Sequence, residues 1–222
     1  MATEHSLAVQ RTARYYTVGD QQAAGDVWFV CHGYGQLAAA FAESFQLIAR
    51  PGRLIVAPEG LSRFYMDATT RAGSARAMGA SWMTREDRLN EIADYVRYLD
   101  VVYDRVFSGL QREAVRVTAL GFSQGVATIC RWLAQRHARA DHVILWAATI
   151  PPELPYAEGP SLFGGARISL VLGQRDTAID SAAFGENESL LHSNGFLVRR
   201  YSFAGGHRLD NETLRTLADG VD

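Results

Sequence analysis

The 222-residue chain has only two cysteines, Cys31 and Cys130. Two cysteines are too few for the bridged framework of a small secreted domain or for the paired ligands of a structural zinc site. No apolar run approaches the roughly 20 residues of a membrane-spanning helix. Residues 1–16 lack the basic stretch followed by an apolar run that marks a signal peptide. These absences predict a protein without disulfides or a membrane span, with the cytoplasm as its expected location.

The chain also lacks a large excess of acidic or basic residues. The net charge is -2, so electrostatics gives no reason to expect nucleic acid or an anionic membrane as a partner. Hydrophobic residues make up 48% and charged residues 21% of the chain, proportions typical of a globular enzyme that exclude disorder as the main state. The length suits one hydrophobic core, and residues 1–222 are expected to form a single domain.

Short apolar runs alternate along the chain with longer segments of helical period. The predicted strands are residues 27–31, 54–57, 115–120, 142–147, 168–172 and 196–203. The predicted helices are residues 37–50, 85–110, 124–137, 181–194 and 211–218. This alternation predicts an α/β fold, a mostly parallel central sheet flanked by helices. In such sheets the functional residues gather at the carboxyl ends of the strands.

The longest predicted helix, residues 85–110, carries a start signal. Thr84 followed three residues later by Asp87 is typical of a capping box. Behind it, apolar residues recur at three- and four-residue steps from Leu89 to Leu110, which predicts one buried face.

The segment Gly121-Phe122-Ser123-Gln124-Gly125 matches the pattern G-x-S-x-G between a predicted strand and a predicted helix. A turn this tight places the serine in a strained conformation, and the glycines allow neighbouring backbone to approach. The helix N-terminus beneath it favours a developing negative charge. The alternative is a glycine-rich connection whose serine only caps the helix. The placement favours Ser123 as a nucleophile.

A serine hydroxyl needs a base to remove its proton. Five of the six histidines have structural or surface explanations, but His207 follows the predicted strand 196–203 through a glycine-rich loop. Hydrolases with the chain order Ser, Asp, His keep their base there. The alternative is a solvated loop histidine. We therefore take His207 as the candidate base.

The base needs a carboxylate that fixes its tautomer. Asp176 comes just after the predicted strand 168–172, whereas Asp180 precedes the next helix, where it could serve as a cap. Asp176 is the preferred acid, and Asp180 is the alternative.

The oxyanion of the tetrahedral intermediate needs backbone N–H donors. One is expected from Gln124, the residue after the nucleophile. The other is expected from the glycine-rich loop that follows strand 27–31, with Tyr34 as the donor.

The stretch from Leu61 to Met83 is long for an ordinary connection and is expected to lie over the same end of the sheet as the nucleophile. Its apolar side chains suit an acyl pocket, and four are predicted to bind substrate: Phe64, Tyr65, Trp82 and Met83. The alternative is that these side chains only cover the sheet edge.

At these residues the chain resembles the phospholipase/carboxylesterase group of α/β-hydrolases, which includes the acyl-protein thioesterases. The likeness extends from about Val27 onward, and its marks are the sequences HGYG, PEG, SWMTRED, GFSQG, GQRD and GGH. The resemblance implies an α/β-hydrolase fold without a separate cap domain and a Ser123–Asp176–His207 triad. It also implies Tyr34 and Gln124 as oxyanion donors, and no metal or organic cofactor.

The loop after the first strand reads HGYGQ, whereas the thioesterase members usually have HGLGD. This difference favours a carboxylesterase acting on small-molecule esters over a protein deacylase. A thioesterase or a lysophospholipase of the same fold is the alternative, and a catalytically dead hydrolase fold used for binding is a third hypothesis. The sequence leaves the physiological substrate, the acyl length and the choice between monomer and homodimer open.

Overall fold

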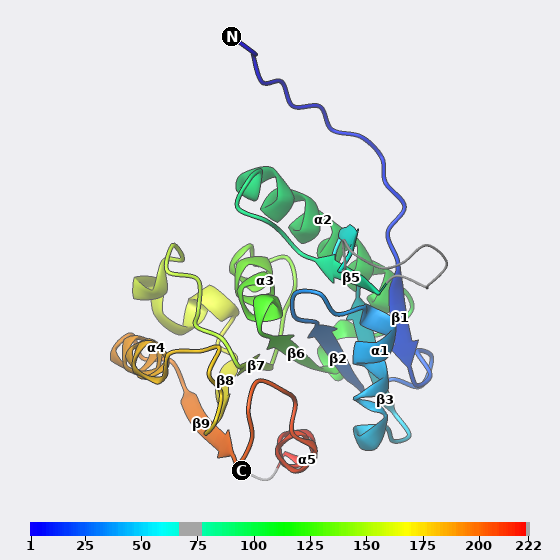
Figure 1. The fold of residues 1–222 in the computed structure, drawn as a ribbon. Helices are drawn as coiled ribbons and strands as arrows, with labels where there is room; N and C mark the ends of the chain where they lie inside the picture. Colours follow the sequence, from blue (N-terminus) through cyan, green and yellow to red (C-terminus); the bar gives the residue numbers. More distant parts are fainter. Residues whose placement is uncertain (67–76, 221–222) are drawn as a thin grey trace.

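The computed structural model describes residues 1–66 and 77–220, and its main feature is a twisted seven-stranded sheet (Figure 1). The strand order is β1-β3-β2-β6-β7-β8-β9, in which β1 is antiparallel to β3 and the other pairs are parallel. The strands of this sheet are β1 (Tyr15–Val18), β2 (Asp26–Cys31), β3 (Arg53–Pro58), β6 (Arg116–Phe122), β7 (His142–Trp146), β8 (Arg167–Gly173) and β9 (Val198–Phe203).

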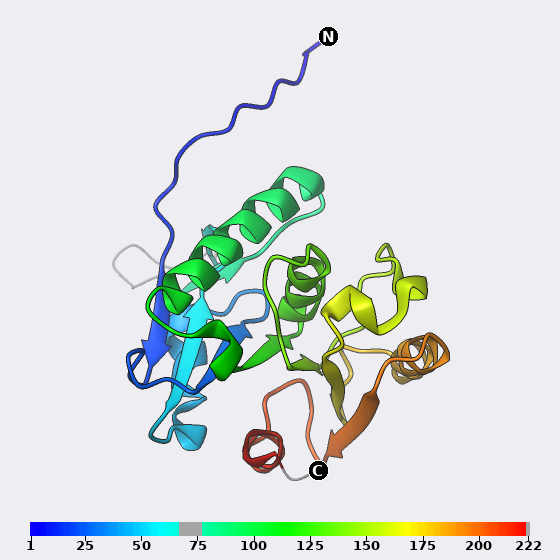
Figure 2. The same cartoon turned by 180° about the vertical axis from the view of Figure 1, so that it is seen from behind.

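Helices cover both faces of the sheet (Figures 1 and 2). The helices are α1 (Ala38–Glu43), α2 (Arg88–Phe107), α3 (Gln124–Ala134), α4 (Ser181–Ser193) and α5 (Asn211–Asp219), with 3-10 turns at Gln46–Ile48, Arg112–Ala114 and Tyr156–Phe163. Buried side chains of α2, α3 and α4 share one hydrophobic cluster with one face of the sheet. Those of α1 and α5 share a second cluster with the other face. The two-sided burial explains why the parallel strands are apolar without alternation.

All six predicted strands and the predicted α/β sheet are confirmed. The predicted helix 37–50 is wrong in extent, because α1 ends at Glu43 and a separate 3-10 turn follows. The long helix begins at Arg88, and the predicted capping box does not form. Instead, the N–H and hydroxyl of Thr84 both donate to the Glu91 carboxylate. Residues 82–87 thus lead from a strand into the helix without forming its first turn.

Three short strands were not predicted. β1 is an edge strand with alternating half-exposed residues, so it lacks the apolar run of the central strands. β4 (Ser62–Tyr65) and β5 (Met78–Ser81) form a separate antiparallel pair within the segment 61–83. Residues 67–76 of that segment lie outside the described residues. Four-residue strands of mixed polarity leave too short a pattern to detect.

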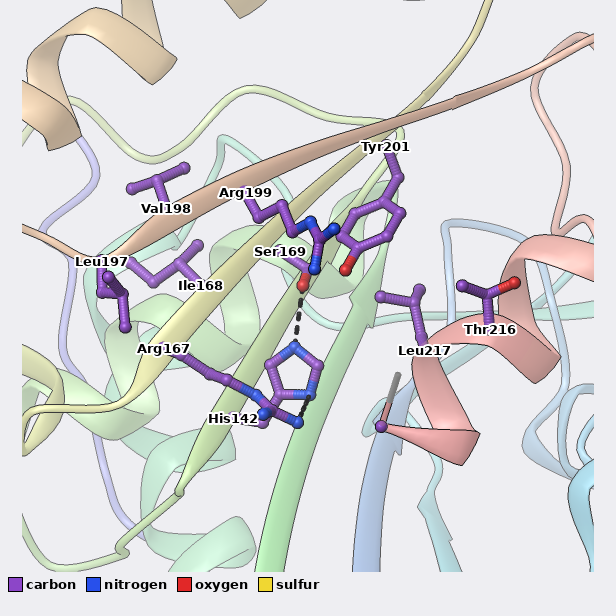
Figure 3. A pocket seen from close by; sticks show the side chains of 11 residues that line it. His142, Arg167, Ile168, Ser169, Leu197, Val198, Arg199, Tyr201, Thr216 and Leu217 are labelled. Carbon is purple, nitrogen blue, oxygen red and sulfur yellow. Dashed lines mark hydrogen bonds between the residues drawn. The ribbon is translucent and has the colours of Figure 1, made fainter. Parts of the chain in front are cut away.

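His142, at the start of β7, is a buried histidine with 2% of its surface exposed. Its Nε2 lies 2.8 Å from Ser169 Oγ and its Nδ1 lies 3.5 Å from Arg167 Nη2. Burial, aided by the positive charges of Arg167 and Arg116, lowers the pKa of His142 to about 3. A cavity of about 300 Å³ opens beside it, between the sheet and α5 (Figure 3). This end of the sheet holds the amino ends of the parallel strands, away from Ser123.

We expect His142 to make the protein less stable as the pH falls from 7 to 5. Its pKa is about 3 in the folded protein and about 6.5 in the unfolded chain, so in this range only unfolding allows it to bind a proton. The free energy of unfolding should therefore fall by about 2 kcal/mol from this residue alone. Urea unfolding at both pH values measures the change. A His142→Gln variant should lose less stability over the interval, and an equal loss would contradict the assignment.

Candidate active site

The chain turns sharply at Ser123, between β6 and α3. Its φ of 53° and ψ of -119° are rare for a residue with a side chain and cost on the order of 1–3 kcal/mol. Glycine is required on both sides of this turn because backbone atoms of neighbouring segments approach closely. A Cβ at Gly121 would lie 2.3 Å from the Gly125 carbonyl oxygen, and one at Gly125 would lie 2.1 Å from the Cys31 carbonyl oxygen. This packing accounts for the G-x-S-x-G pattern.

Three side chains form a line of hydrogen bonds at the carboxyl ends of the strands. Nε2 of His207 lies 3.0 Å from Ser123 Oγ, and Nδ1 of the same ring lies 2.8 Å from Asp176 Oδ2. The Asp176 side chain has no exposed surface, so its carboxylate faces the ring rather than water. An Nδ1–H donating to this carboxylate leaves the Nε2 lone pair facing the serine hydroxyl. A nucleophile, a base and an orienting acid would need contacts in this order.

Asp180 lies elsewhere and has a different contact. Its Oδ1 accepts the N–H of Ala182 at 2.9 Å and so caps α4. Of the two aspartates proposed from the sequence, Asp176 is therefore the one that contacts His207.

The loops that carry the acid and the base are bonded to each other. The N–H of Arg175 donates to the Gly205 carbonyl at 2.8 Å, and its guanidinium donates to the Ala204 carbonyl at 3.1 Å. The indole N–H of Trp146 donates to the Arg208 carbonyl at 3.0 Å, which ties the histidine loop to β7. The two loops thus form one hydrogen-bonded unit beside the nucleophile.

The loop His32–Gly35, which follows β2, lies against the nucleophile. A Cβ on Gly33 would come within 3.2 Å of Ser123 Cβ. The N–H of Gly35 donates to the Ala80 carbonyl at 2.9 Å and fixes the far side of the loop. Within residues 1–66 and 77–220, no acceptor faces the N–H of Tyr34 or of Gln124. The assignment of these two N–H groups as oxyanion donors stays a prediction.

The Gln124 side chain attaches the segment after β5 to the nucleophile turn. Its Oε1 accepts the N–H of Trp82 at 3.0 Å, and its Nε2 donates to the Met83 carbonyl at 2.8 Å. This segment was expected to line an acyl pocket, but Trp82 is only 1% exposed. Its indole N–H donates to the His32 carbonyl at 2.8 Å, and its rings pack on the His32 ring. Trp82 is a core residue here, and Met83 is half-buried.

The other two predicted pocket residues lie on β4, near the loop His32–Gly35, the candidate oxyanion loop. The ring of Phe64 stacks on that of Tyr34 with centroids 5.1 Å apart, and Tyr34 is 61% exposed. Tyr65 is 60% exposed. The structure therefore separates the predicted set: Phe64 is half-buried against Tyr34, Tyr65 is exposed and Trp82 is buried.

Sequence reasoning assigned no role to Glu59, which follows β3. Its side chain is 1% exposed and binds Arg14 and Arg63. The turn Pro-Glu-Gly is typical of an exposed position, and nothing in the sequence shows that arginines cover it. Its neighbour Gly60 donates its N–H to His32 Nε2 at 2.9 Å, which connects this turn to the candidate oxyanion loop.

Within the described residues, neither cysteine is a candidate nucleophile and no metal site is found. Burial raises the pKa of the Cys130 thiol to about 12 and that of Cys31 further, so neither sulfur is a reactive thiolate. Among residues 1–66 and 77–220, no three His, Cys, Asp or Glu side chains gather in a way that could hold a metal ion. No helix in this part of the chain is long and apolar enough to cross a membrane.

No protein-family model and no curated protein sequence matches the chain. Solved structures do. Zea mays acyl-protein thioesterase 2 is 14% identical, with a TM-score of 0.66 over 94% of this chain and 97% of that one. The Bacillus cereus carboxylesterase is 13% identical, with a TM-score of 0.68 over 93% and 92%. A carboxylesterase from Mesorhizobium loti is 20% identical, with a TM-score of 0.64 over 94% and 95%.

These likenesses cover nearly the whole of each chain and show the fold. The α/β-hydrolase fold expected from the sequence is confirmed, and the resemblance to the phospholipase/carboxylesterase group is supported at the level of the fold.

The contact between Asp176 and His207 predicts unequal effects of two conservative substitutions. Asp176→Asn should lower turnover of an ester by about ten-thousandfold, because the amide favours the wrong tautomer of the base. Asp180→Asn should change turnover less than threefold, since asparagine caps a helix about as well as aspartate. Steady-state kinetics of the two variants checks this. The reverse ranking would assign the acid to Asp180.

The burial of Trp82 and the exposure around Phe64 predict a second contrast. Trp82→Ala should lower the free energy of unfolding by about 3–5 kcal/mol, as for a large core side chain. Phe64→Ala should cost far less stability and should alter the relative kcat/KM for esters of different acyl length. Thermal denaturation and an acyl-length series measure both effects. A parallel loss of rate for every ester in Phe64→Ala would argue against a pocket at this position.

Proposed function

We propose that the protein is a serine carboxylesterase that hydrolyses small-molecule carboxylic esters through an acyl-enzyme intermediate. The observation that carries the proposal is the hydrogen-bonded line from Asp176 through His207 to Ser123. Beside this line lie the N–H groups of Tyr34 and Gln124, which have no acceptor within residues 1–66 and 77–220.

In the first half-reaction, Ser123 Oγ attacks the ester carbonyl carbon while His207 Nε2 takes the hydroxyl proton. The carboxylate of Asp176 stabilises the imidazolium that forms and holds the ring in place. The carbonyl oxygen becomes an oxyanion and accepts hydrogen bonds from the N–H groups of Tyr34 and Gln124. The intermediate collapses when the C–O bond to the alcohol breaks, and the alcohol leaves with the proton from His207.

In the second half-reaction, water takes the place of the alcohol. His207 removes a proton from the water, the oxygen attacks the acyl carbon, and the Ser123 ester bond breaks. The serine recovers its proton from His207, and the carboxylic acid leaves. Every step uses side chains and backbone groups of this chain.

A thioesterase is the second candidate, because the same groups would act on a thioester carbonyl. It is supported by the fold similarity to the maize protein named acyl-protein thioesterase 2. The loop sequence HGYGQ, in place of the HGLGD usual in the thioesterase members, favours the small-molecule ester. A lysophospholipase would need an acyl groove, which acyl-length preference would reveal.

Ser123→Ala should abolish both ester hydrolysis and labelling by a fluorophosphonate probe while the fold is kept. The expected loss of turnover is on the order of a millionfold, because the nucleophile is removed. The assay is hydrolysis of p-nitrophenyl esters from acetate to palmitate, with one matched acyl thioester. Circular dichroism and thermal unfolding serve as the control for folding.

Three results would overturn the proposal in different ways. Labelling of the alanine variant would place the nucleophile elsewhere. A wild-type protein that neither labels nor hydrolyses any substrate would indicate a binding protein with a hydrolase fold. A thioester cleaved at least tenfold faster than its matched ester would favour the thioesterase.

A further inference from the structure

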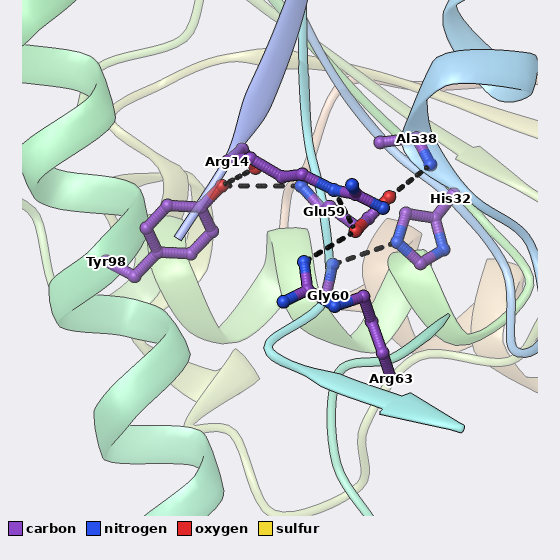
Figure 4. A network of polar contacts seen from close by, with 7 residues as sticks. All are labelled: Arg14, His32, Ala38, Glu59, Gly60, Arg63 and Tyr98. Carbon is purple, nitrogen blue, oxygen red and sulfur yellow. Dashed lines mark hydrogen bonds and ion pairs between the residues drawn. The ribbon is translucent and has the colours of Figure 1, made fainter. Parts of the chain in front are cut away.

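A buried carboxylate lies under the oxyanion loop, outside the catalytic line. Glu59 follows β3, and its side chain is 1% exposed. Its Oε1 accepts from Arg14 Nε at 2.6 Å and from Arg63 Nη1 at 3.3 Å (Figure 4). Its Oε2 accepts the N–H of Ala38, the first residue of α1, at 3.2 Å. Both carboxylate oxygens are therefore engaged, one by two cations and the other by a backbone donor.

The contacts around Glu59 keep it ionised. Burial by itself would raise the pKa of the Glu59 carboxyl, but the hydrogen bonds from Arg14 and Ala38 and the charge of Arg14 outweigh burial, and the pKa is lowered. A buried carboxylate that loses one of its cations becomes unfavourable. The position of Glu59 thus depends on Arg14, which lies 45 residues earlier in the chain.

Arg14 is held by its backbone as well as by its side chain. Its carbonyl accepts the hydroxyl of Tyr98 at 2.6 Å and the N–H of Glu59 at 3.2 Å. The residues just before β1 are thereby attached to both α2 and the turn after β3 (Figure 4).

The turn at Glu59 and Gly60 contacts both ends of the segment from His32 to Ala38, which contains the candidate oxyanion loop. At one end, the N–H of Gly60 donates to His32 Nε2 at 2.9 Å, and Nδ1–H of that ring donates to the Gly33 carbonyl at 2.8 Å. Burial lowers the pKa of His32, so the ring stays neutral and can accept at Nε2. At the other end, Glu59 holds the N–H of Ala38, four residues beyond Tyr34. The loop between these two anchors carries the Tyr34 N–H.

We infer that Glu59 is a positioning residue: with Arg14, it fixes the loop from His32 to Ala38 so that the Tyr34 N–H points at the developing oxyanion. This role rests on the proposed esterase function. Oxyanion donors act because they are aligned before charge develops. A carboxylate bound at both oxygens gives that alignment without touching the substrate. It stabilises the transition state and leaves ground-state binding unchanged.

Glu59→Gln is the main test, because the amide keeps the size of the side chain and removes its charge. We expect kcat to fall about tenfold with KM unchanged, less than the hundredfold or more that follows complete loss of an oxyanion donor. The inhibition constant of a trifluoromethyl ketone, which forms an oxyanion on Ser123, should rise by the same factor. A fall in stability without these two changes would overturn the inference and leave Glu59 a structural residue.

Glu153→Gln is the matched control. Glu153 also binds two arginines, Arg88 at 2.6 Å and Arg131 at 2.8 Å, but within residues 1–66 and 77–220 it forms no hydrogen bond or ion pair with the oxyanion loop. We expect this variant to lose stability and to keep kcat and the inhibition constant within about twofold. Equal effects on kcat in both variants would show that the loss of any carboxylate bound by two arginines slows the enzyme, and the inference would fail.

Two further measurements separate this inference from the proposed function. If Arg14 acts through Glu59, the double variant Arg14→Gln/Glu59→Gln should have the kcat of Glu59→Gln alone within about twofold, because the two residues are one unit.

Hydrogen exchange tests the position of the loop without requiring turnover. Amides in residues 32–42 should exchange faster in Glu59→Gln than in the wild type, and unchanged exchange would overturn the inference even for an active esterase.

Discussion

The close packing of the first turn of α3 on the end of β2 is the constraint from which the site follows. The Gly125 backbone lies so near the Cys31 carbonyl that a Cβ would come within 2.1 Å. Because glycine has no side chain, the first turn of α3 can approach this closely. Ser123 therefore lies directly beside the loop that continues from Cys31. Ser123 and the candidate oxyanion donors are thus neighbours because of this backbone packing.

A catalytic site of the kind proposed usually needs support from a second layer of residues. Here that layer is polar and comes from distant parts of the chain. The Gln124 side chain holds the residues after β5, Arg175 holds the histidine loop, and Glu59 holds the start of α1. Each contact fixes backbone rather than substrate. The site therefore combines hydrogen-bonded backbone with an exposed side chain at Tyr34.

The sequence predicted the elements whose pattern is local. The central strands are apolar runs, and the placement of Ser123, Asp176 and His207 at strand ends follows from chain order. What it could not predict depends on long-range contacts. Glu59 looks exposed until Arg14 packs over it, and Trp82 looks like a pocket residue until its indole meets the His32 carbonyl. The pattern at Thr84 predicted a helix cap, but Glu91 competes for the same donors one turn later.

The loops that carry Asp176 and His207 are bonded to each other, so a change in the length of one loop affects the other. Arg175 and Gly205 are 30 positions apart, yet their backbones are bonded at 2.8 Å. A Cβ on Gly173 would collide with Gly205 at 2.5 Å. An insertion in either loop would shift both members of the Asp176–His207 pair relative to Ser123. The two loops can therefore change in length only together if the Asp176–His207 pair is to keep its place beside Ser123.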